Sequence, residues 1–140
     1  MSFEWKSVKL GDIGRIVTGK TPPSGYPDYY GKEYMFVTPR DIGNQKYIRM
    51  TERYLSKLGG AKLKKQMIRG KSVCVSCIGS DMGKVVMTEA VCVTNQQINA
   101  ITDINEEFNP EFVYYTLKLL REYFHKIAGG STMPIINKRN

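Results

Sequence analysis

The amino-acid sequence predicts a mixed α+β fold in a single domain, with a twisted, mostly antiparallel β-sheet packed against a C-terminal helix. Short stretches of β-branched and alternating residues between glycine or polar breaks are typical of strands. One longer stretch near the C-terminus has helical periodicity. The length of 140 residues, 41% of them hydrophobic, suffices for one core but not for a core and a separate catalytic lobe.

The first half of the chain alternates short elements with turn-forming residues. We expect a short N-terminal element at residues 8–13 and strands at residues 14–18 and 34–37. Between these strands, residues 19–27 contain two glycines and three prolines, which break regular structure and predict a loop. A short helix is expected over residues 55–63, although each of its two glycines weakens it by about 1 kcal/mol relative to alanine.

The remaining strands are expected in the second half. Residues 72–78, 84–87 and 96–102 contain the β-branched and alternating residues that favour extended structure. Glycine or polar residues separate these three stretches. We therefore expect them to pair into the twisted sheet.

The clearest helix begins at Asn109, an N-cap residue followed by Pro110 at the first helical position. It is expected to continue to about Ala128, because Gly129 and Gly130 end it. Apolar and small residues recur at helical spacing and predict the face that packs against the sheet. That face comprises Phe112, Thr116, Leu119, Leu120, Tyr123, Phe124 and Ile127.

The three cysteines do not favour a disulfide framework or a zinc site. Cys74 and Cys77 form a C-x-x-C pattern, but positions three apart in a strand point to opposite faces. With Cys92 they make an odd number, and the sole histidine, His125, lies far along the chain. We expect no metal. No signal sequence and no run long enough to cross a membrane is visible, so we expect a cytoplasmic protein without membrane contact.

The net charge of +8 comes from one segment. Residues 40–71 carry ten basic and two acidic side chains, whereas the other 108 residues carry eleven of each. A local positive field attracts polyanions, and each neutralised phosphate releases counterions. The pattern favours DNA or RNA as a partner, although a charge run also occurs as a plain solvated surface.

Two motifs approach those of enzymes without matching them. Residues 79–84 resemble a phosphate-binding loop, but one residue is missing between the glycines and Val85 occupies the position of the magnesium-binding Ser or Thr. Residues 109–112 resemble the Asn-Pro-Pro-Phe/Tyr motif of amino-methyltransferases, but the second proline is absent. Since no base, nucleophile or metal cluster is evident, we expect no catalysis.

Three stretches rich in amide, hydroxyl and glycine groups occur in a fixed order and suit recognition better than catalysis. Together with other motifs they resemble a target recognition domain of the specificity (S) subunit of type I restriction-modification systems. The resemblance covers nearly the whole chain. It rests on Trp5, Leu10-Gly11-Asp12-Ile13, Gly19-Lys20-Thr21-Pro22, Ser76-Cys77-Ile78-Gly79-Ser80 with Gly83-Lys84, Thr94-Asn95-Gln96-Gln97-Ile98-Asn99-Ala100-Ile101, Tyr114-Tyr115 and Gly130-Ser131-Thr132-Met133-Pro134.

The resemblance implies sequence-specific recognition of double-stranded DNA. Such a subunit has two recognition domains, each reading one half of a bipartite site, separated by long helices that pair as a coiled coil. Residues 1–140 look like one half without its spacer helix, through which a second recognition domain or a homodimer would form. The methyltransferase (M) subunit carries S-adenosylmethionine and the restriction (R) subunit uses ATP and Mg. This non-catalytic chain is expected to bind none of these cofactors.

Groove chemistry assigns candidate DNA contacts, since lysine and arginine bind phosphates, arginine reads guanine and Asn or Gln reads adenine. The candidates for base reading are Lys20, Thr21, Ser24, Arg40, Asn44, Gln45 and Gln66. The candidates for phosphate contact are Lys46, Arg49, Arg53, Lys57, Lys62, Lys64, Lys65 and Arg69. Tyrosines near the loop either stack on bases or pack in the protein: Tyr26, Tyr29, Tyr30 and Tyr34.

The recurring motifs are expected to build the scaffold, because members of the family carry them while reading different sequences. The scaffold candidates are Gly79, Ser80, Gly83, Lys84, Asn95, Gln96, Gln97, Asn99, Ser131 and Thr132. Two other functions remain open. One is the recognition end of a fused restriction-methylation enzyme, which turnover by the chain would reveal. The other is an RNA-binding or protein-docking module, which a preference for RNA over duplex DNA would reveal.

Overall fold

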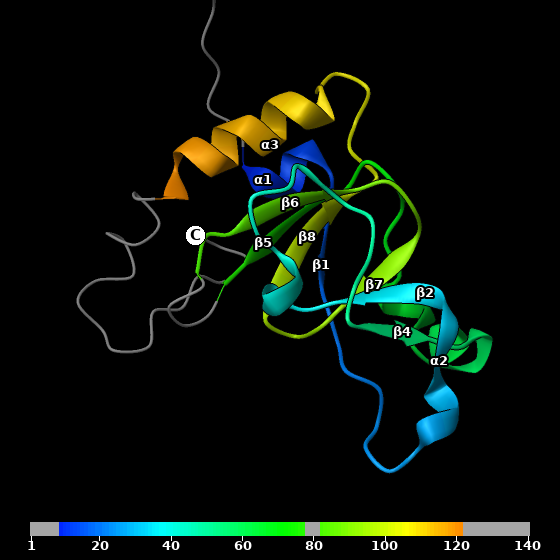
Figure 1. Cartoon of the computed structure of the whole chain (residues 1–140). Coiled ribbons are helices and arrows are strands. Elements are labelled where there is room, and N and C mark those ends of the chain that lie inside the picture. The colour runs from blue at the N-terminus through cyan, green and yellow to red at the C-terminus, as the bar shows by residue number, and fades with distance from the viewer. Residues whose placement is uncertain (1–8, 78–81, 122–140) are drawn as a thin grey trace, which may run out of the picture.

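The structure, a computed structural model, describes residues 9–77 and 82–121 (Figure 1). Its strands form two sheets, and its helices are short apart from the last; η denotes a one-turn 3₁₀ helix. In chain order the elements are α1 (Leu10–Ile13), β1 (Arg15–Thr18), η1 (Pro27–Tyr29), β2 (Tyr30–Val37), η2 (Pro39–Asp41), β3 (Tyr47–Ile48), β4 (Arg53–Leu55), α2 (Lys57–Lys62), η3 (Lys64–Gln66), β5 (Val73–Ser76), β6 (Val85–Thr88), β7 (Cys92–Thr94), β8 (Ile98–Thr102) and α3 (Pro110–Leu119).

The predicted α+β class is confirmed, but the single predicted sheet is two. The larger sheet has the order β1-β8-β5-β6-β3 and is antiparallel except between β6 and β3. The smaller sheet has the order β4-β2-β7, with β2 antiparallel to β4 and parallel to β7. The sequence did not predict β3, β4 and β7 because their two or three residues are too few to show alternation.

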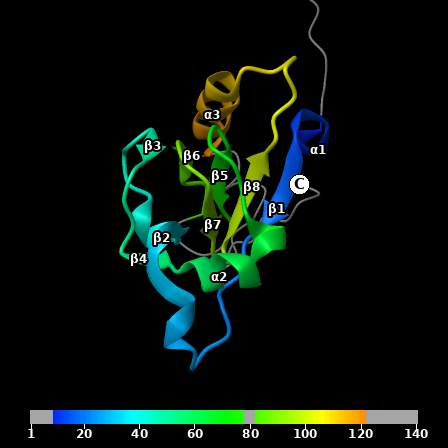
Figure 2. The same ribbon diagram turned by 90° about the vertical axis from the view of Figure 1, so that its right-hand side faces the viewer.

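The helices and sheets lie in layers (Figures 1 and 2), and alternate residues of the strands pack in different ones. Val73 of β5 packs beneath α3, whereas its neighbour Cys74 lies in the core between the two sheets. In the smaller sheet Met35 faces that same core, and Phe36 packs with Leu63 on the side of α2. The layers therefore run from α3 through the larger and smaller sheets to α2.

The start of α3 is confirmed, and the described part of the helix corrects its predicted core face. The Asn109 side chain accepts a hydrogen bond from the backbone N–H of Glu111 at 2.9 Å. The buried residues of α3 are Val113, Tyr114 and Leu117. The predicted stripe is instead exposed: Phe112 is 67% and Leu119 85% accessible, and Thr116 and Leu120 are exposed too. Tyr123, Phe124 and Ile127, like the predicted helix end, lie outside the described residues.

The three cysteines are free and buried. Cys74 and Cys92 lie in the core between the sheets, where burial raises the pKa of the Cys92 thiol to about 12. Among residues 9–77 and 82–121, no three His, Cys, Asp or Glu side chains are grouped so that they could hold a metal ion. No helix in these same ranges has the length and apolar character needed to span a membrane.

Candidate nucleic-acid interface

The loop of residues 19–26 starts from a close contact with β7 and β8. The backbone N–H of Gly19 donates to the carbonyl of Ile98 at 3.1 Å, and that of Lys20 donates to the carbonyl of Thr94 at 2.9 Å. A Cβ atom on Gly19 would lie only 2.1 Å from the Thr94 carbonyl oxygen. Only glycine fits at this position, because the backbone of the loop lies directly against the backbone at the end of β7.

The amide motif holds the same loop through side chains. The Thr21 hydroxyl donates to the Gln96 side-chain oxygen at 2.6 Å. At the end of β1, directly before the loop, the Thr18 hydroxyl donates to Asn99 Oδ1 at 2.6 Å. Asn99 Nδ2 in turn donates to the Cys77 sulfur at 3.2 Å. Since Gln96 and Asn99 bond within the protein, both amides brace the base of the loop.

Other scaffold candidates form local turns. Asn95 Oδ1 accepts from the Gln97 N–H at 3.0 Å, before β8 begins. Gly83 has a φ of +87°, which favours glycine, and its N–H donates to the Ser76 carbonyl at 2.8 Å. The Lys84 N–H donates to the Ser76 hydroxyl at 3.0 Å. The remaining scaffold candidates lie outside the described residues: Gly79, Ser80, Ser131 and Thr132.

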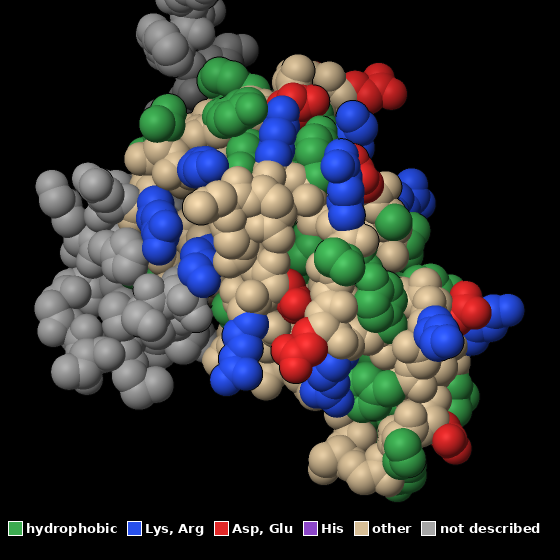
Figure 3. All heavy atoms as spheres, in the orientation of Figure 1, with side chains coloured by type: hydrophobic (Ala, Val, Ile, Leu, Met, Phe, Trp, Pro, Cys, Tyr) green, Lys and Arg blue, Asp and Glu red, His purple; other side chains and the backbone are tan. Residues whose placement is uncertain are grey.

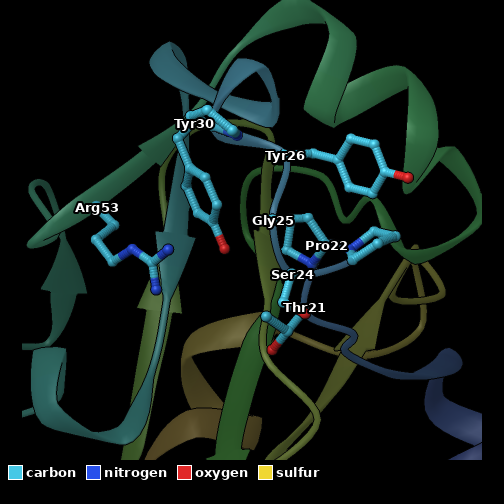
Figure 4. A pocket seen from close by; sticks show the side chains of 9 residues that line it. Thr21, Pro22, Ser24, Gly25, Tyr26, Tyr30 and Arg53 are labelled. Carbon is cyan, nitrogen blue, oxygen red and sulfur yellow. The ribbon is translucent and has the colours of Figure 1, made fainter.

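An open cleft of about 510 Å³ lies beside the loop. Residues 21–27 line one part of it, and Tyr30 and Arg53 line another (Figure 4). Of the predicted base-reading residues, the cleft therefore brings together Thr21 and Ser24. It also includes Arg53, which the sequence analysis assigned to phosphate.

Arg53 is positioned by an aromatic ring. Its guanidinium carbon lies 4.0 Å from the centroid of the Tyr30 ring. Tyr30 in turn meets Phe36 edge-on, with 6.4 Å between ring centroids. From sequence, Tyr30 is expected only to belong to the tyrosines near the loop. Its pairing with Arg53 depends on strand register, since β2 bulges between Tyr30 and Tyr34 where it pairs with β4.

The α2 helix packs against η1, which follows the loop, and carries exposed lysines. Its first turn is capped by Ser56, whose hydroxyl accepts from the Gly59 N–H at 3.1 Å. A Cβ atom on Gly59 would lie 2.0 Å from the Tyr29 carbonyl oxygen, so the helix-weakening glycine permits close packing against η1. The exposed lysines on α2 and η3 are Lys57, Lys62, Lys64 and Lys65.

Three of the predicted phosphate-binding cations are paired with carboxylates far along the chain. Lys46 bonds Glu111, and the hydrogen bond to Glu111 raises the pKa of Lys46. Arg49 donates two hydrogen bonds to Glu89, each 3.1 Å long. Arg69 and Arg15 both approach Asp103, at 3.3 and 3.1 Å. On the face in Figure 3, basic side chains are spread out with acidic ones between them.

The other base-reading candidates lie outside the cleft lining. Arg40 is exposed on η2, and Gln66 is half-buried at the end of η3. Gln45 makes local hydrogen bonds, accepting from the Gly43 N–H and donating to the Asp41 carbonyl, both at 2.7 Å. Exposed Asn44 belongs to that same turn, and Lys20 is exposed in the loop.

The ion pairs predict a dependence of stability on acid pH. The hydrogen bonds from Arg49 hold the pKa of Glu89 below its ordinary value of 4.5. A depressed folded-state pKa contributes stability above the ordinary value, and that contribution is lost as the pH falls through the folded-state pKa. In urea titrations, Glu89→Gln should therefore lower the unfolding midpoint slightly at pH 6, and the difference should become smaller as the pH falls to about 2.5.

A matched control for this titration is Glu106→Gln. Glu106 is exposed and forms no ion pair with any residue that the structure describes. Its replacement should leave the midpoint close to that of the parent at both pH values. A Glu89→Gln difference of equal size at pH 6 and pH 2.5 would contradict the electrostatic explanation.

Comparison with known families gives the class of this module, a DNA specificity domain. The chain matches the family described as "Type I restriction modification DNA specificity domain" over residues 3–140, and it belongs to this family. Thus the resemblance drawn from the sequence motifs is confirmed.

Individual relatives agree with this assignment. The chain is 38% identical over 133 residues to the "Type I restriction enzyme HindI specificity subunit" of Haemophilus influenzae, covering 94% of the chain and 28% of that protein. It is 29% identical over 140 residues to the "Type I restriction enzyme MjaIX specificity subunit" of Methanocaldococcus jannaschii, covering 94% and 31%. The chain thus spans about a third of the length of these relatives.

Solved structures share the fold. The HsdS subunit from Thermoanaerobacter tengcongensis superposes with a TM-score of 0.65 at 19% identity, over 85% of this chain and 28% of that one. The type I S subunit from M. genitalium gives a TM-score of 0.62 at 17% identity, over 96% of this chain and 31% of that one. At this level of identity the likeness concerns architecture.

Proposed function

We propose that this chain recognises one half of a bipartite double-stranded DNA site and directs the catalytic subunits of a type I restriction-modification complex to it. The observation that carries the proposal is the braced loop of residues 19–26 facing Arg53 across an open cleft, in a chain of the specificity family. A loop fixed at its base can enter a DNA groove without a large loss of conformational entropy.

Recognition uses two kinds of contact, one to phosphates and one to base edges. The exposed lysines of α2 and η3 bind phosphates and set the position of the domain on the duplex. The side chains of the cleft and loop then read base edges in the major groove. Lys46, Arg49 and Arg69 contribute less to phosphate binding, because their charges are already paired with Glu111, Glu89 and Asp103.

The chain itself is non-catalytic in this proposal. A methyltransferase subunit binds S-adenosylmethionine and a restriction subunit uses ATP and Mg, while this domain supplies only the DNA specificity. A second recognition domain, or a second copy joined through a spacer helix, reads the other half-site. Because the substrate is cellular DNA, the complex acts in the cytoplasm. The relatives named as specificity subunits support the specificity role of this chain.

Methylome sequencing tests the proposal. The chain is co-expressed with the methyltransferase subunit of its system, with any native downstream sequence included, and methylated adenines in host DNA are mapped. We expect methylation confined to one short motif. Exchange of residues 40–71 for those of a relative should abolish or redirect it, because this segment carries β4, α2 and η3. The Glu106→Gln variant should keep the parental motif.

Two outcomes would reject the proposed function. One is a stable complex that methylates without any sequence preference. The other is binding that favours RNA over duplex DNA at equal salt, which would identify an RNA-binding module. Turnover by the chain without partner subunits would show instead that it belongs to an enzyme.

A further inference from the structure

We infer that Arg53 reads a guanine in the recognised half-site and that Tyr30 is the residue that presents its guanidinium for this purpose. The inference rests on the proposed function, and it gives Arg53 a specificity role in place of the phosphate contact expected from its charge. It also names one element of the substrate, a G·C base pair.

The stacked geometry leaves the hydrogen-bonding edge of Arg53 available. With its guanidinium carbon 4.0 Å from the Tyr30 ring centroid, the group lies in van der Waals contact with the ring face. A guanidinium on an aromatic face still carries its N–H donors around its own plane. Two of these donors match O6 and N7 of guanine in the major groove, which is the commonest specific base contact of arginine.

The stack is held in place by the fold. Tyr30 packs with Phe36, Leu55 and Leu63 in the cluster beneath α2. The backbone of Arg53 is fixed by β4, and its carbonyl accepts a hydrogen bond from the Thr51 hydroxyl at 2.7 Å. A long side chain that is already oriented loses less entropy on binding, so more of its hydrogen-bond energy is available for discrimination.

Arg53 also differs from Arg49 and Arg69, two other arginines of the basic segment, in its partners. Arg49 is bonded to Glu89 and Arg69 to Asp103, whereas Arg53 forms no ion pair with any described residue. Glu52 lines a second depression beside Arg53 but makes no ion pair with it. The donors of Arg53 therefore do not have to break a salt bridge before they bind a base.

The surroundings suit a base edge better than a phosphate. Pro22, Tyr26 and Tyr30 bring apolar rings to the cleft, and Ser24 brings a hydroxyl (Figure 4). Apolar walls reduce competition from water and strengthen hydrogen bonds made there. The exposed lysines on α2 and η3, by contrast, are surrounded by solvent, as phosphate contacts commonly are.

Selection from a pool of duplexes with randomised sequence tests the assignment. The purified 140-residue chain and the Arg53→Lys variant are each used to select DNA at low salt, and bound duplexes are sequenced. The parent should prefer guanine at one position by about 10- to 100-fold, the range of a good bidentate contact. Lysine keeps the charge but lacks the paired, planar N–H donors of arginine. In Arg53→Lys this preference should therefore fall below about threefold, with other positions unchanged.

Three further variants separate base reading from phosphate contact and from misfolding. Tyr30→Phe keeps the ring and should keep the guanine preference, whereas Tyr30→Leu should reduce it at that same position. Lys57→Ala should weaken binding to all sequences alike and reduce the salt slope by about one. The melting temperature of Arg53→Lys should stay close to that of the parent, because Arg53 is exposed.

The outcomes distinguish the guanine assignment from the proposed function. If the parent selects a motif and Arg53→Lys selects the same motif with the same preferences, the guanine assignment is wrong and the proposed function stands. A loss in Arg53→Lys that is uniform over all sequences, as for Lys57→Ala, also overturns it. If the parent selects no motif, DNA reading by this chain is rejected, and the role of Arg53 with it.

Discussion

Gly19→Ala should lower the free energy of unfolding by about 3 kcal/mol, the upper end of the usual cost of inserting a methyl group into a packed site. The added Cβ would lie 2.1 Å from the Thr94 carbonyl oxygen and 2.2 Å from that of Asn95. Both are backbone atoms, which cannot rotate away as a flexible side chain can. Relief requires the loop to separate from β7, with loss of the Lys20 to Thr94 hydrogen bond.

Urea denaturation followed by circular dichroism measures this effect, with Gly11→Ala as the matched control. Gly11 lies in α1, and a Cβ atom there would meet nothing within 4 Å. Its replacement should leave the free energy of unfolding unchanged or raise it by up to about 1 kcal/mol, because alanine favours the helix more than glycine does. A Gly19→Ala variant as stable as the parent would show that the loop is not anchored as described.

Gly19→Ala should also affect recognition, because residues 21–27 line the cleft that faces Arg53. A displaced loop would no longer present Thr21 and Ser24 in a fixed position. In the duplex selection, the variant should therefore lose sequence preference while retaining salt-dependent binding through its lysines. If the variant kept the full parental motif, the anchoring of the loop at Gly19 would not be needed for reading DNA.

Tyr114→Ala should cost about 3 to 5 kcal/mol, the range for truncating a large buried aromatic side chain. Tyr114 is 1% accessible and packs in the core between α3 and the larger sheet. Its removal leaves a cavity among the side chains of β5, β6 and β8, where close packing of strands limits collapse. The same urea titration measures the loss.

Leu119→Ala on the same helix is the control for this substitution. Leu119 is 85% accessible, so its truncation should change the unfolding free energy by no more than about 0.5 kcal/mol. The apolar stripe predicted from sequence would reverse this order, because it placed Leu119 in the core and left out Tyr114. A larger cost for Leu119→Ala than for Tyr114→Ala would therefore restore the original assignment of the helix face.

Local chemistry explains which elements the sequence predicted well. Asn109 followed by Pro110 marks a helix start through contacts within one turn, and the structure shows the expected cap. The glycines and prolines of residues 19–27 interrupt regular structure by their own backbone preferences. The short strands β3, β4 and β7 were missed because they depend on partners elsewhere in the chain.

The face of α3 shows where periodicity loses its predictive power. Phe112, Leu119 and Leu120 lie at helical spacing, but so do Val113, Tyr114 and Leu117. A helix with apolar residues on two flanks does not indicate which flank meets the sheet. The choice depends on packing against the larger sheet, where Val113, Tyr114 and Leu117 meet the side chains of β5, β6 and β8.

The sequence by itself determined the α+β class, the loop after β1, the capped start of α3 and the motifs that mark the family, because these depend on neighbouring residues and on motif order. Only the tertiary structure decided which cations are paired and which remain available. Glu111, Glu89 and Asp103 pair with cations that lie from 34 residues (Arg69 to Asp103) to 88 residues (Arg15 to Asp103) away in the sequence. Tyr30 meets Arg53 through a bulged strand register. Such pairings follow from long-range packing, which no local pattern of charge or hydrophobicity records.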